Sequence, residues 1–192
     1  MRIVAGSLRG RNIAAPEGEG TRPTIDRVRE ALFSSLYSLR GGFDGAIVLD
    51  AFAGSGALGI EALSRGAQRA VFYERDAKAA SVTRANVKAC GLDGSQATVV
   101  QRDVLQAPPS VQAAPFDLVF LDPPYAYDPD DVLAMVCALH DSQALATDAI
   151  IVYEHDIKTK TEVAQAAEKA GFEVIASKKY GKTGVTMLRK HA

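Results

Sequence analysis

A short motif with an acid, two prolines and a tyrosine follows a mostly apolar segment of the chain. Asp122-Pro123-Pro124-Tyr125 comes directly after residues 116–121. Two successive prolines fix the backbone and remove two N–H donors, so the nearby carbonyls and the Asp122 carboxylate make a site of acceptors only. Such a site suits the exocyclic amine of a planar base, with Tyr125 stacked on the ring. The motif predicts group transfer to an amino nitrogen of a flipped base.

A glycine-rich loop earlier in the chain has the composition of a nucleotide-type cofactor site. Gly54, Gly56 and Gly59 have the spacing G-x-G-x-x-G, which lets a backbone turn sharply and approach a ligand closely. Glu74 follows about 20 residues later, where a carboxylate can accept hydrogen bonds from ribose hydroxyls. Nicotinamide dehydrogenases and S-adenosylmethionine enzymes share this spacing. Asp50 would repel a pyrophosphate and suits the cationic methionine end of S-adenosylmethionine, so the loop favours the sulfonium cofactor.

Three further residues belong to the predicted cofactor site. Phe52 and Ser55 lie inside the glycine-rich loop. Asp103 follows a predicted strand, where its carboxylate can accept a hydrogen bond from the adenine amino group. The alternative role for Glu74 and Asp103 is a helix cap or a surface charge. Their positions at predicted strand ends favour a role in binding.

Short apolar runs alternate with longer amphipathic stretches, a pattern typical of a sheet covered by helices. The two last apolar runs are separated only by a turn and predict an antiparallel hairpin. We therefore expect an α/β fold whose mostly parallel sheet has one reversed strand near its end. The predicted strands are 46–50, 70–74, 98–101, 117–121, 150–154, 172–177 and 185–188, and the predicted helices are 57–65, 77–90, 130–140 and 161–170.

An amino-terminal part precedes this pattern. Residues 1–20 predict an extended arm or a small hairpin, and residues 24–39 predict a helix with Arg27 and Arg29 on its exposed face. We expect two parts: 1–40, a basic arm and helix, and 41–192, the main domain. Positive charge gathers at both ends, with +3 in 1–40 and +5 in 176–192 against –9 between them. Clustered Arg and Lys make nucleic acid a candidate partner.

These motifs resemble those of the bacterial RsmD-type methyltransferases, which methylate the exocyclic N2 amine of one guanine in 16S rRNA of the small ribosomal subunit. The resemblance rests on residues 2–11, 21–33, 50–66, 122–125 and 152–154, in the same order along the chain. It implies a Rossmann-like, seven-stranded S-adenosylmethionine-dependent methyltransferase fold. It also implies a substrate of small-subunit ribosomal RNA, which we expect to be read within an assembled particle.

The resemblance also implies roles for individual residues. Asp50, Gly54 and Gly56 would hold the methionine end of the cofactor, Glu74 the ribose and Asp103 the adenine edge. Residues 122–125 would hold the target guanine. The basic amino-terminal part would lie on RNA, through Arg9, Arg11, Arg22, Thr24 and Arg27.

Other functions remain open at this point. A DNA adenine-N6 or cytosine-N4 methyltransferase would use the same Asp-Pro-Pro-Tyr chemistry, although we find no evident region for reading a DNA sequence. A non-catalytic RNA-binding assembly factor could keep the fold, but the intact Asp122, Tyr125 and glycine loop argue against it. An NAD-dependent oxidoreductase is a more distant possibility.

Composition excludes several other classes. No apolar run approaches the ~20 residues of a membrane span, and the first residues lack a signal-peptide pattern, so we expect a cytoplasmic protein without a membrane partner. Cys90 and Cys137 fit neither a disulfide framework nor a zinc site. His140, His155 and His191 are expected to be structural or exposed, and no residue spacing predicts a metal site.

Overall fold

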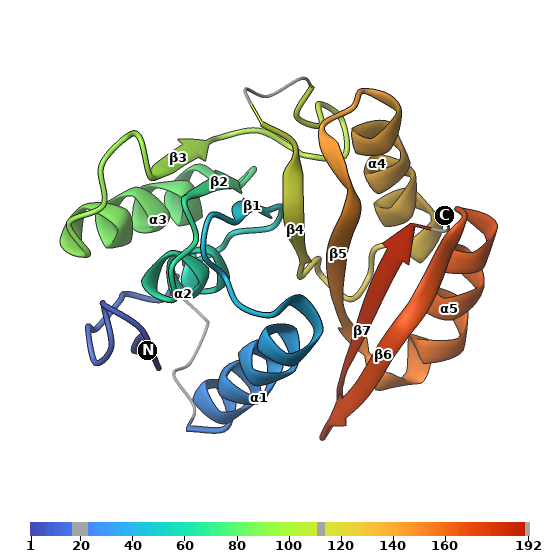
Figure 1. Cartoon of the computed structure of the whole chain (residues 1–192), viewed down its shortest axis with the longest axis horizontal. Helices are drawn as coiled ribbons and strands as arrows, with labels where there is room; N and C mark the ends of the chain where they lie inside the picture. Colours follow the sequence, from blue (N-terminus) through green and yellow to red (C-terminus); the bar gives the residue numbers. More distant parts are fainter. Residues whose placement is uncertain (17–22, 111–113, 191–192) are drawn as a thin grey trace. The chain divides into compact units, whose positions relative to one another are not determined.

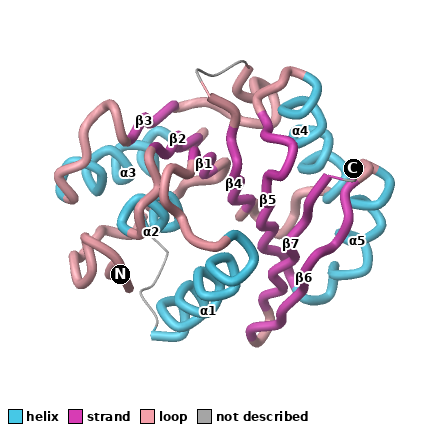
Figure 2. Tube along the Cα trace, viewed as in Figure 1, coloured by secondary structure: helices cyan, strands magenta, loops and turns pink. Residues whose placement is uncertain are grey.

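The computed structural model describes residues 1–16, 23–110 and 114–190, with the backbone alone for 23–25. The chain divides into two compact units, Met1–Arg102 and Asp103–Ala192. Figures 1 and 2 show the elements of each. The predicted α/β class with a seven-stranded, mostly parallel sheet is confirmed.

The first unit is a three-stranded parallel sheet with helices packed on it. Its strand order is β3-β2-β1, and α2 packs on β1 and β2 while α3 packs on β3. Asp76 caps α3 by accepting the Ala79 N–H at 2.8 Å. The elements are α1 (Pro23–Arg40), β1 (Ile47–Asp50), α2 (Ala57–Ser64), β2 (Arg69–Tyr73), α3 (Ala77–Ala89) and β3 (Ala97–Val100).

Residues 1–16 form the small hairpin predicted for the arm. Arg2 and Asn12 pair in an antiparallel bridge, and the Ile3 N–H donates to the Arg11 carbonyl at 2.9 Å. The side chains of Ile3 and Ile13 are buried. The arm is thereby anchored by apolar contacts as well as by backbone hydrogen bonds.

The second unit has the strand order β4-β5-β7-β6. Strands β4 and β5 are parallel, while β7 runs antiparallel to both β5 and β6, so the predicted reversed strand near the end is confirmed. The elements are β4 (Phe116–Leu121), α4 (Pro129–Asp141), β5 (Leu145–Asp156), the 3-10 helix η1 (Ile157–Thr159), α5 (Lys160–Lys169), β6 (Phe172–Tyr180) and β7 (Thr183–Lys190).

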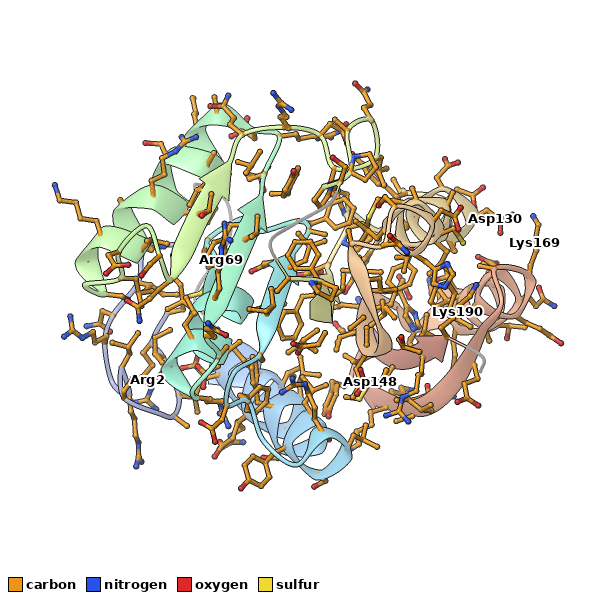
Figure 3. All side chains as sticks on the ribbon, turned by 45° about the horizontal axis from the view of Figure 1, so that its top comes forward. Arg2, Arg69, Asp130, Asp148, Lys169 and Lys190 are labelled. Atoms are coloured by element: carbon orange, nitrogen blue, oxygen red, sulfur yellow. The ribbon has the colours of Figure 1, made fainter. Side chains whose placement is uncertain are left out.

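Helices α4 and α5 pack against each other in this unit. An exposed ion pair joins them, with Lys169 Nζ 2.8 Å from Asp130 Oδ2, and both side chains are labelled in Figure 3. Lys190 Nζ lies 4.7 Å from the centre of the Phe172 ring. Exposed pairs of this kind contribute little to stability, so the apolar contacts of the helices with the sheet matter more.

Strands β5, β6 and β7 extend well beyond their predicted bounds, and β7 runs from Thr183 to Lys190 instead of the predicted 185–188. Strand β5 begins at Leu145, five residues before the predicted start, and its pairing with β4 shifts register between Phe116 and Leu118. The exposed Thr147 and Asp148 lie in this early part of β5 and interrupt the apolar pattern. Strand β6 similarly continues through polar residues to Tyr180.

The predicted exposure of Arg29 is wrong. Helix α1 is close to its predicted bounds, but Arg29 is only 4% exposed and shares the buried face with Leu32, Phe33 and Leu36. Its guanidinium is paired with Asp26 at 2.9 Å and lies 3.6 Å from the buried Glu61 carboxylate. A long-range partner therefore allows a charged residue to replace an apolar one on this face.

No helix in the described part of the chain is both long and apolar enough to cross a membrane.

Candidate functional site

The carboxylate of Asp50 ties the end of β1 to the start of α2. Asp50 is 2% exposed, and its Oδ2 accepts the Gly59 N–H at 3.0 Å. Burial raises the pKa of Asp50 to about 7; the Gly59 hydrogen bond opposes this rise, and the nearby Glu74 charge adds to it. Asp50 thus holds the glycine-rich loop from its buried side, and its direct contact with a cofactor stays a prediction.

Glu74 lies directly after β2 and holds the other side of the same loop. Its Oε2 accepts the Gly54 N–H at 2.9 Å, and its Oε1 accepts the Asp76 N–H at 2.8 Å. Each carboxylate oxygen has two lone pairs, so these bonds leave acceptor capacity on both oxygens. The half-buried Glu74 can therefore shape the loop and also accept hydrogen bonds from a ligand.

The loop itself turns through left-handed backbone conformations. Gly54 and Gly56 have φ values of 53° and 77°, a region that favours glycine. A Cβ atom at Gly56 would lie 2.9 Å from Thr83 Cγ2. Ser55 between them is buried, and Phe52 is half-buried. The glycine spacing therefore reflects both backbone conformation and close packing against α3.

Two polar residues of α3 hold the loop, and neither was predicted from the sequence. Thr83 Oγ1 donates to the Gly54 carbonyl at 2.7 Å, and Asn86 Nδ2 donates to the Ser55 carbonyl at 2.8 Å. Both side chains are buried. Their spacing with Ala79 places them on the inward face of α3, and polar residues at such positions indicate a buried hydrogen-bond partner.

Asn86 also connects the loop to the amino-terminal arm. Its Oδ1 accepts the Ala14 N–H at 2.8 Å, and its Nδ2 donates to the Ala14 carbonyl at 2.9 Å. Met1 Sδ lies 3.5 Å from Ser55 Oγ. The arm and the glycine-rich loop therefore share one hydrogen-bonded network.

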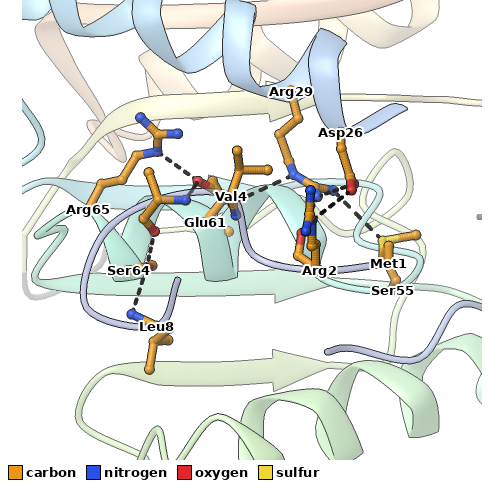
Figure 4. Close-up of polar contacts among 12 residues, drawn as sticks. Met1, Arg2, Val4, Leu8, Asp26, Arg29, Ser55, Glu61, Ser64 and Arg65 are labelled. Atoms are coloured by element: carbon orange, nitrogen blue, oxygen red, sulfur yellow. Dashed lines mark hydrogen bonds and ion pairs between the residues drawn. The ribbon is translucent and has the colours of Figure 1, made fainter. Parts of the chain in front are cut away.

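A buried carboxylate on α2 anchors the arm, as Figure 4 shows. Glu61 is fully buried and accepts the N–H groups of Val4 and Ala5 at 2.8 and 3.0 Å. Arg65 Nε donates to the same carboxylate at 2.8 Å. The Leu8 N–H donates to Ser64 Oγ at 3.0 Å. These contacts make residues 1–16 an integral part of the first unit.

The structure places the predicted RNA-contact residues in different surroundings. Arg9, Arg11 and Arg27 are exposed, and Arg11 also donates to the Ala89 carbonyl at 3.0 Å. Arg22 and the side chain of Thr24 lie outside the described residues. Three arginines of the predicted surface are therefore on the outside of the first unit.

The Asp-Pro-Pro-Tyr segment follows β4 in the second unit. Asp122, Pro124 and Tyr125 are exposed, while Pro123 is buried and anchors the segment. The Pro124 carbonyl accepts the Tyr127 N–H at 2.9 Å, so one of the carbonyls expected to face a ligand already has a backbone partner. Among the exposed residues of this segment, Asp122 carries the carboxylate and Tyr125 the aromatic ring.

Tyr125 is positioned by the first residue of β7. Its hydroxyl lies 3.1 Å from Thr183 Oγ1, and 49% of the residue remains exposed. Partial burial raises the pKa of Tyr125, the Thr183 hydrogen bond lowers it, and the charges of Glu154, Asp122 and Asp156 raise it further. The ring is therefore held at its hydroxyl end in an acidic environment.

Glu154 and His155, near the end of β5, are both titratable residues that are at least half-buried. Burial raises the pKa of Glu154 to about 6. His155 is buried, with Nδ1 donating to the Asp156 carbonyl at 2.8 Å and Nε2 2.9 Å from Thr186 Oγ1. Both imidazole nitrogens thus have protein partners, which gives His155 a structural role.

Asp103 is the first residue of the second unit. Its Oδ1 accepts the Leu105 N–H at 3.0 Å, an interaction that orders the turn after it. The predicted contact of Asp103 with adenine stays a prediction. Within the described residues, no group of three or more His, Cys, Asp or Glu side chains is arranged to hold a metal ion.

Comparisons with known proteins agree with this arrangement. The Bacillus subtilis protein YlbH, provisionally named as an rRNA methyltransferase, is 38% identical over 193 residues, which is 99% of each chain. Ribosomal RNA small subunit methyltransferase D of Haemophilus influenzae is 37% identical over 80% of this chain and 78% of its own. Among solved structures, the Escherichia coli protein yhhF, provisionally described as a methyltransferase, has a TM-score of 0.79 at 32% identity and matches 100% of this chain and 98% of its own.

The fold is therefore the Rossmann-like methyltransferase fold expected from the motifs. A family model described as Conserved hypothetical protein 95 matches residues 1–189. With that match and relatives above 30% identity over 80–99% of this chain, the chain belongs to this family, that of the RsmD-type methyltransferases.

Proposed function

We propose that this protein is an S-adenosylmethionine-dependent methyltransferase that modifies the N2 amine of a flipped guanine in 16S rRNA of the small ribosomal subunit. The observation that carries the proposal is the exposed Asp122-Pro-Pro-Tyr125 segment after β4, with its tyrosine ring held by Thr183. The names of the relatives support ribosomal RNA as the substrate.

The side chains and backbone of the first unit have the chemistry needed to bind S-adenosylmethionine. Glu74 keeps acceptor capacity for ribose hydroxyls, and the loop of Gly54 and Gly56 brings backbone close to a ligand. In its ionised form, Asp50 places a negative charge beneath the loop, which favours a cationic methionine end over a pyrophosphate. Asp103 would accept the adenine amino group. When bound, S-adenosylmethionine supplies an electrophilic methyl group.

The second unit suits a planar base with an exocyclic amine. The lone pair of such an amine is delocalised into the ring, so the amine is a poor nucleophile. The Asp122 carboxylate accepts its hydrogens and favours a pyramidal nitrogen, while Tyr125 stacks on the ring. After methylation the amine is cationic and acidic, so its proton passes to Asp122 or to water without a stronger base.

The substrate would be an assembled particle, because the small basic arm is the recognition device that the sequence offers. Arg9, Arg11 and Arg27 are exposed and can contact phosphates. Residues 1–16 are fixed to the first unit, so this surface would dock as a rigid body. The proposal includes a cytoplasmic location, where ribosomal subunits are found.

Transfer of labelled methyl from S-adenosylmethionine to small ribosomal subunits, to protein-free RNA from the same subunits and to duplex DNA tests this function. We expect label in the subunit, less in the free RNA and none in DNA. Label confined to DNA would replace this proposal by a DNA amino-methyltransferase. The absence of label in all three would favour a non-catalytic RNA-binding protein. Equal rates on subunits and free RNA would exclude recognition of the particle.

A further inference from the structure

The tip of the β6–β7 hairpin lies beside the Asp-Pro-Pro-Tyr segment. In the sheet, Tyr180 pairs with Thr183 and Lys178 pairs with Val185. Paired residues of antiparallel strands, and residues two apart on one strand, share a face. Lys178, Tyr180 and Thr183 are therefore on one face, and Thr183 on that face contacts the Tyr125 hydroxyl.

The hairpin tip is held firmly. Thr183 pairs with Asp156 of β5, so the sheet continues to the end of the hairpin. The Ile157 N–H donates to the Lys182 carbonyl at 2.8 Å, which fixes the turn from the side of η1. Side chains on this tip can therefore contact a partner without first ordering the backbone.

The charge is negative around the Asp-Pro-Pro-Tyr segment and positive on the tip of the β6–β7 hairpin. Asp122, Glu154 and Asp156 each raise the pKa of Tyr125 through their negative charge. These acids suit an amine but repel the phosphates on either side of a flipped nucleotide. Lys178 and Lys182 are exposed on the hairpin, and residues 176–192 contain five basic residues and no acid. The lysines offer the cations that the acidic segment lacks.

We propose that the tip of the β6–β7 hairpin binds the single-stranded RNA that flanks the target base. Lys178 and Lys182 contact its phosphates, and the half-buried Tyr180 stacks on a neighbouring base. This inference rests on the proposed function and adds a second RNA-contact surface to the amino-terminal arm. Lys179 pairs with Gly184 and therefore lies on the opposite face of the hairpin, where it serves as an internal control.

The phosphate contacts of the two lysines can be tested by RNA binding. Wild-type and variant proteins would be bound to small-subunit RNA at several salt concentrations. For Lys178→Ala/Lys182→Ala we expect about tenfold weaker binding near 0.1 M salt. The slope of log affinity against log salt should fall by about 1.4, because each lost phosphate contact in single-stranded RNA accounts for about 0.7. The matched variant Lys78→Ala/Lys179→Ala has the same net charge and should bind within about twofold of wild type.

Steady-state kinetics of methyl transfer test whether Tyr180 stacks on a base. Tyr180→Leu should raise the KM for RNA about tenfold with kcat at saturating RNA unchanged, because stacking is lost and the reacting groups are kept. Tyr180→Phe keeps the ring and should behave as wild type. Affinity for S-adenosylmethionine should be the same in every variant.

The outcomes separate this inference from the proposed function. If wild type methylates subunit RNA and the lysine variant keeps the wild-type affinity and salt slope, the hairpin is not an RNA surface and the methyltransferase function stands. If wild type binds RNA through the hairpin lysines but transfers no methyl, the hairpin inference stands and the catalytic proposal fails. If wild type neither binds nor methylates small subunits or their RNA, both are wrong.

Discussion

Asp50 ends the buried parallel strand β1 and Asp122 directly follows β4, but their surroundings give them different chemistry. Asp50 is buried, accepts the Gly59 N–H, and has its pKa raised to about 7. Asp122 is exposed after β4. Under the proposed function, a carboxylate that accepts hydrogens from the target amine must be reachable from solvent, so we assign that role to Asp122, while the buried Asp50 shapes the loop.

Asp122→Asn should lower kcat for methyl transfer by about 10²–10³ fold, because the amide places a donor where the base amine needs an acceptor. Affinity for S-adenosylmethionine, measured by calorimetry, should be unchanged. Asp148→Asn changes the same charge at an exposed position of β5 and should leave kcat unaffected. An Asp122→Asn protein with the wild-type rate would remove Asp122 from the mechanism.

The buried Asp50 predicts how stability depends on pH. Its pKa is 3.8 in the unfolded chain and about 7 in the folded protein, so the folded state binds the proton more tightly. The free energy of unfolding should therefore fall as pH rises from about 4 to about 7, by up to ~4 kcal/mol for a shift of this size.

Urea unfolding of wild type and Asp50→Asn across this pH range checks the prediction. The neutral amide can still accept the Gly59 N–H but does not titrate, so the variant should show a much flatter profile. A smaller slope in the same direction should remain from Glu154, whose pKa burial raises to about 6. Identical profiles for the two proteins would show that Asp50 does not titrate as described.

At the scale of elements, Gly59 fixes the distance between α2 and β2. A Cβ atom at this position would lie 2.3 Å from Cε1 of the buried Phe72 ring. Gly59→Ala should lower the free energy of unfolding by ~1–3 kcal/mol, as overpacking in a core does. Gly94→Ala has no neighbouring atom within 4 Å and is the matched control for urea unfolding. Equal stability of the two variants would contradict this packing.

Glu61 gives a second prediction at this scale, because it joins α1, α2 and the arm. Glu61→Ala removes the acceptor of the Val4 and Ala5 N–H groups and of Arg65 Nε, and leaves the buried Arg29 with Asp26 as its carboxylate partner; it should destabilise the protein by ~3–5 kcal/mol. Glu30→Ala removes an exposed acid from α1 and should cost little. Chemical denaturation of both variants provides the measurement, and a mild effect of Glu61→Ala would show that the arm is held by its apolar side chains instead.

Local patterns were enough to predict the elements but not the contacts between them. Glycines and apolar periodicity located all the principal helices and strands, and the short turn after Tyr180 predicted the hairpin. The prediction that Arg29 is exposed was wrong because its partner Glu61 lies far along the chain. Asn86 was missed for the same reason, since its partners Ala14 and Ser55 are distant in sequence. Periodicity carries no information on such pairings.

At the scale of the whole molecule, the predicted cofactor loop and the predicted target segment belong to different compact units. The loop from Asp50 to Gly56 lies in the first unit, and the segment from Asp122 to Tyr125 lies in the second. Family membership explains why both motifs occur in one chain. The sequence located both groups because each directly follows an apolar strand, whereas the loop-holding role of Asp50 and the Thr183 contact of Tyr125 depend on folding.

Cofactor choice can be tested on the intact protein. S-adenosylmethionine at about 100 times its Kd should stabilise the folded state by ~2.7 kcal/mol and raise the Tm, because it binds only the folded protein. NAD at the same concentration should leave the Tm unchanged. Thermal unfolding with each ligand gives the result, and stabilisation by NAD alone would restore the oxidoreductase alternative.

The identity of the methylated nucleoside decides whether the protein modifies the N2 amine of guanine. Small ribosomal subunits methylated by the protein would be digested to nucleosides, separated and identified by mass. We expect N2-methylguanosine as the single new product, formed about 10²–10³ fold more slowly when Asp122→Asn replaces wild type. A methyl group on another atom of guanine, or on another base, would contradict the assignment of the Asp-Pro-Pro-Tyr segment to the guanine N2 amine.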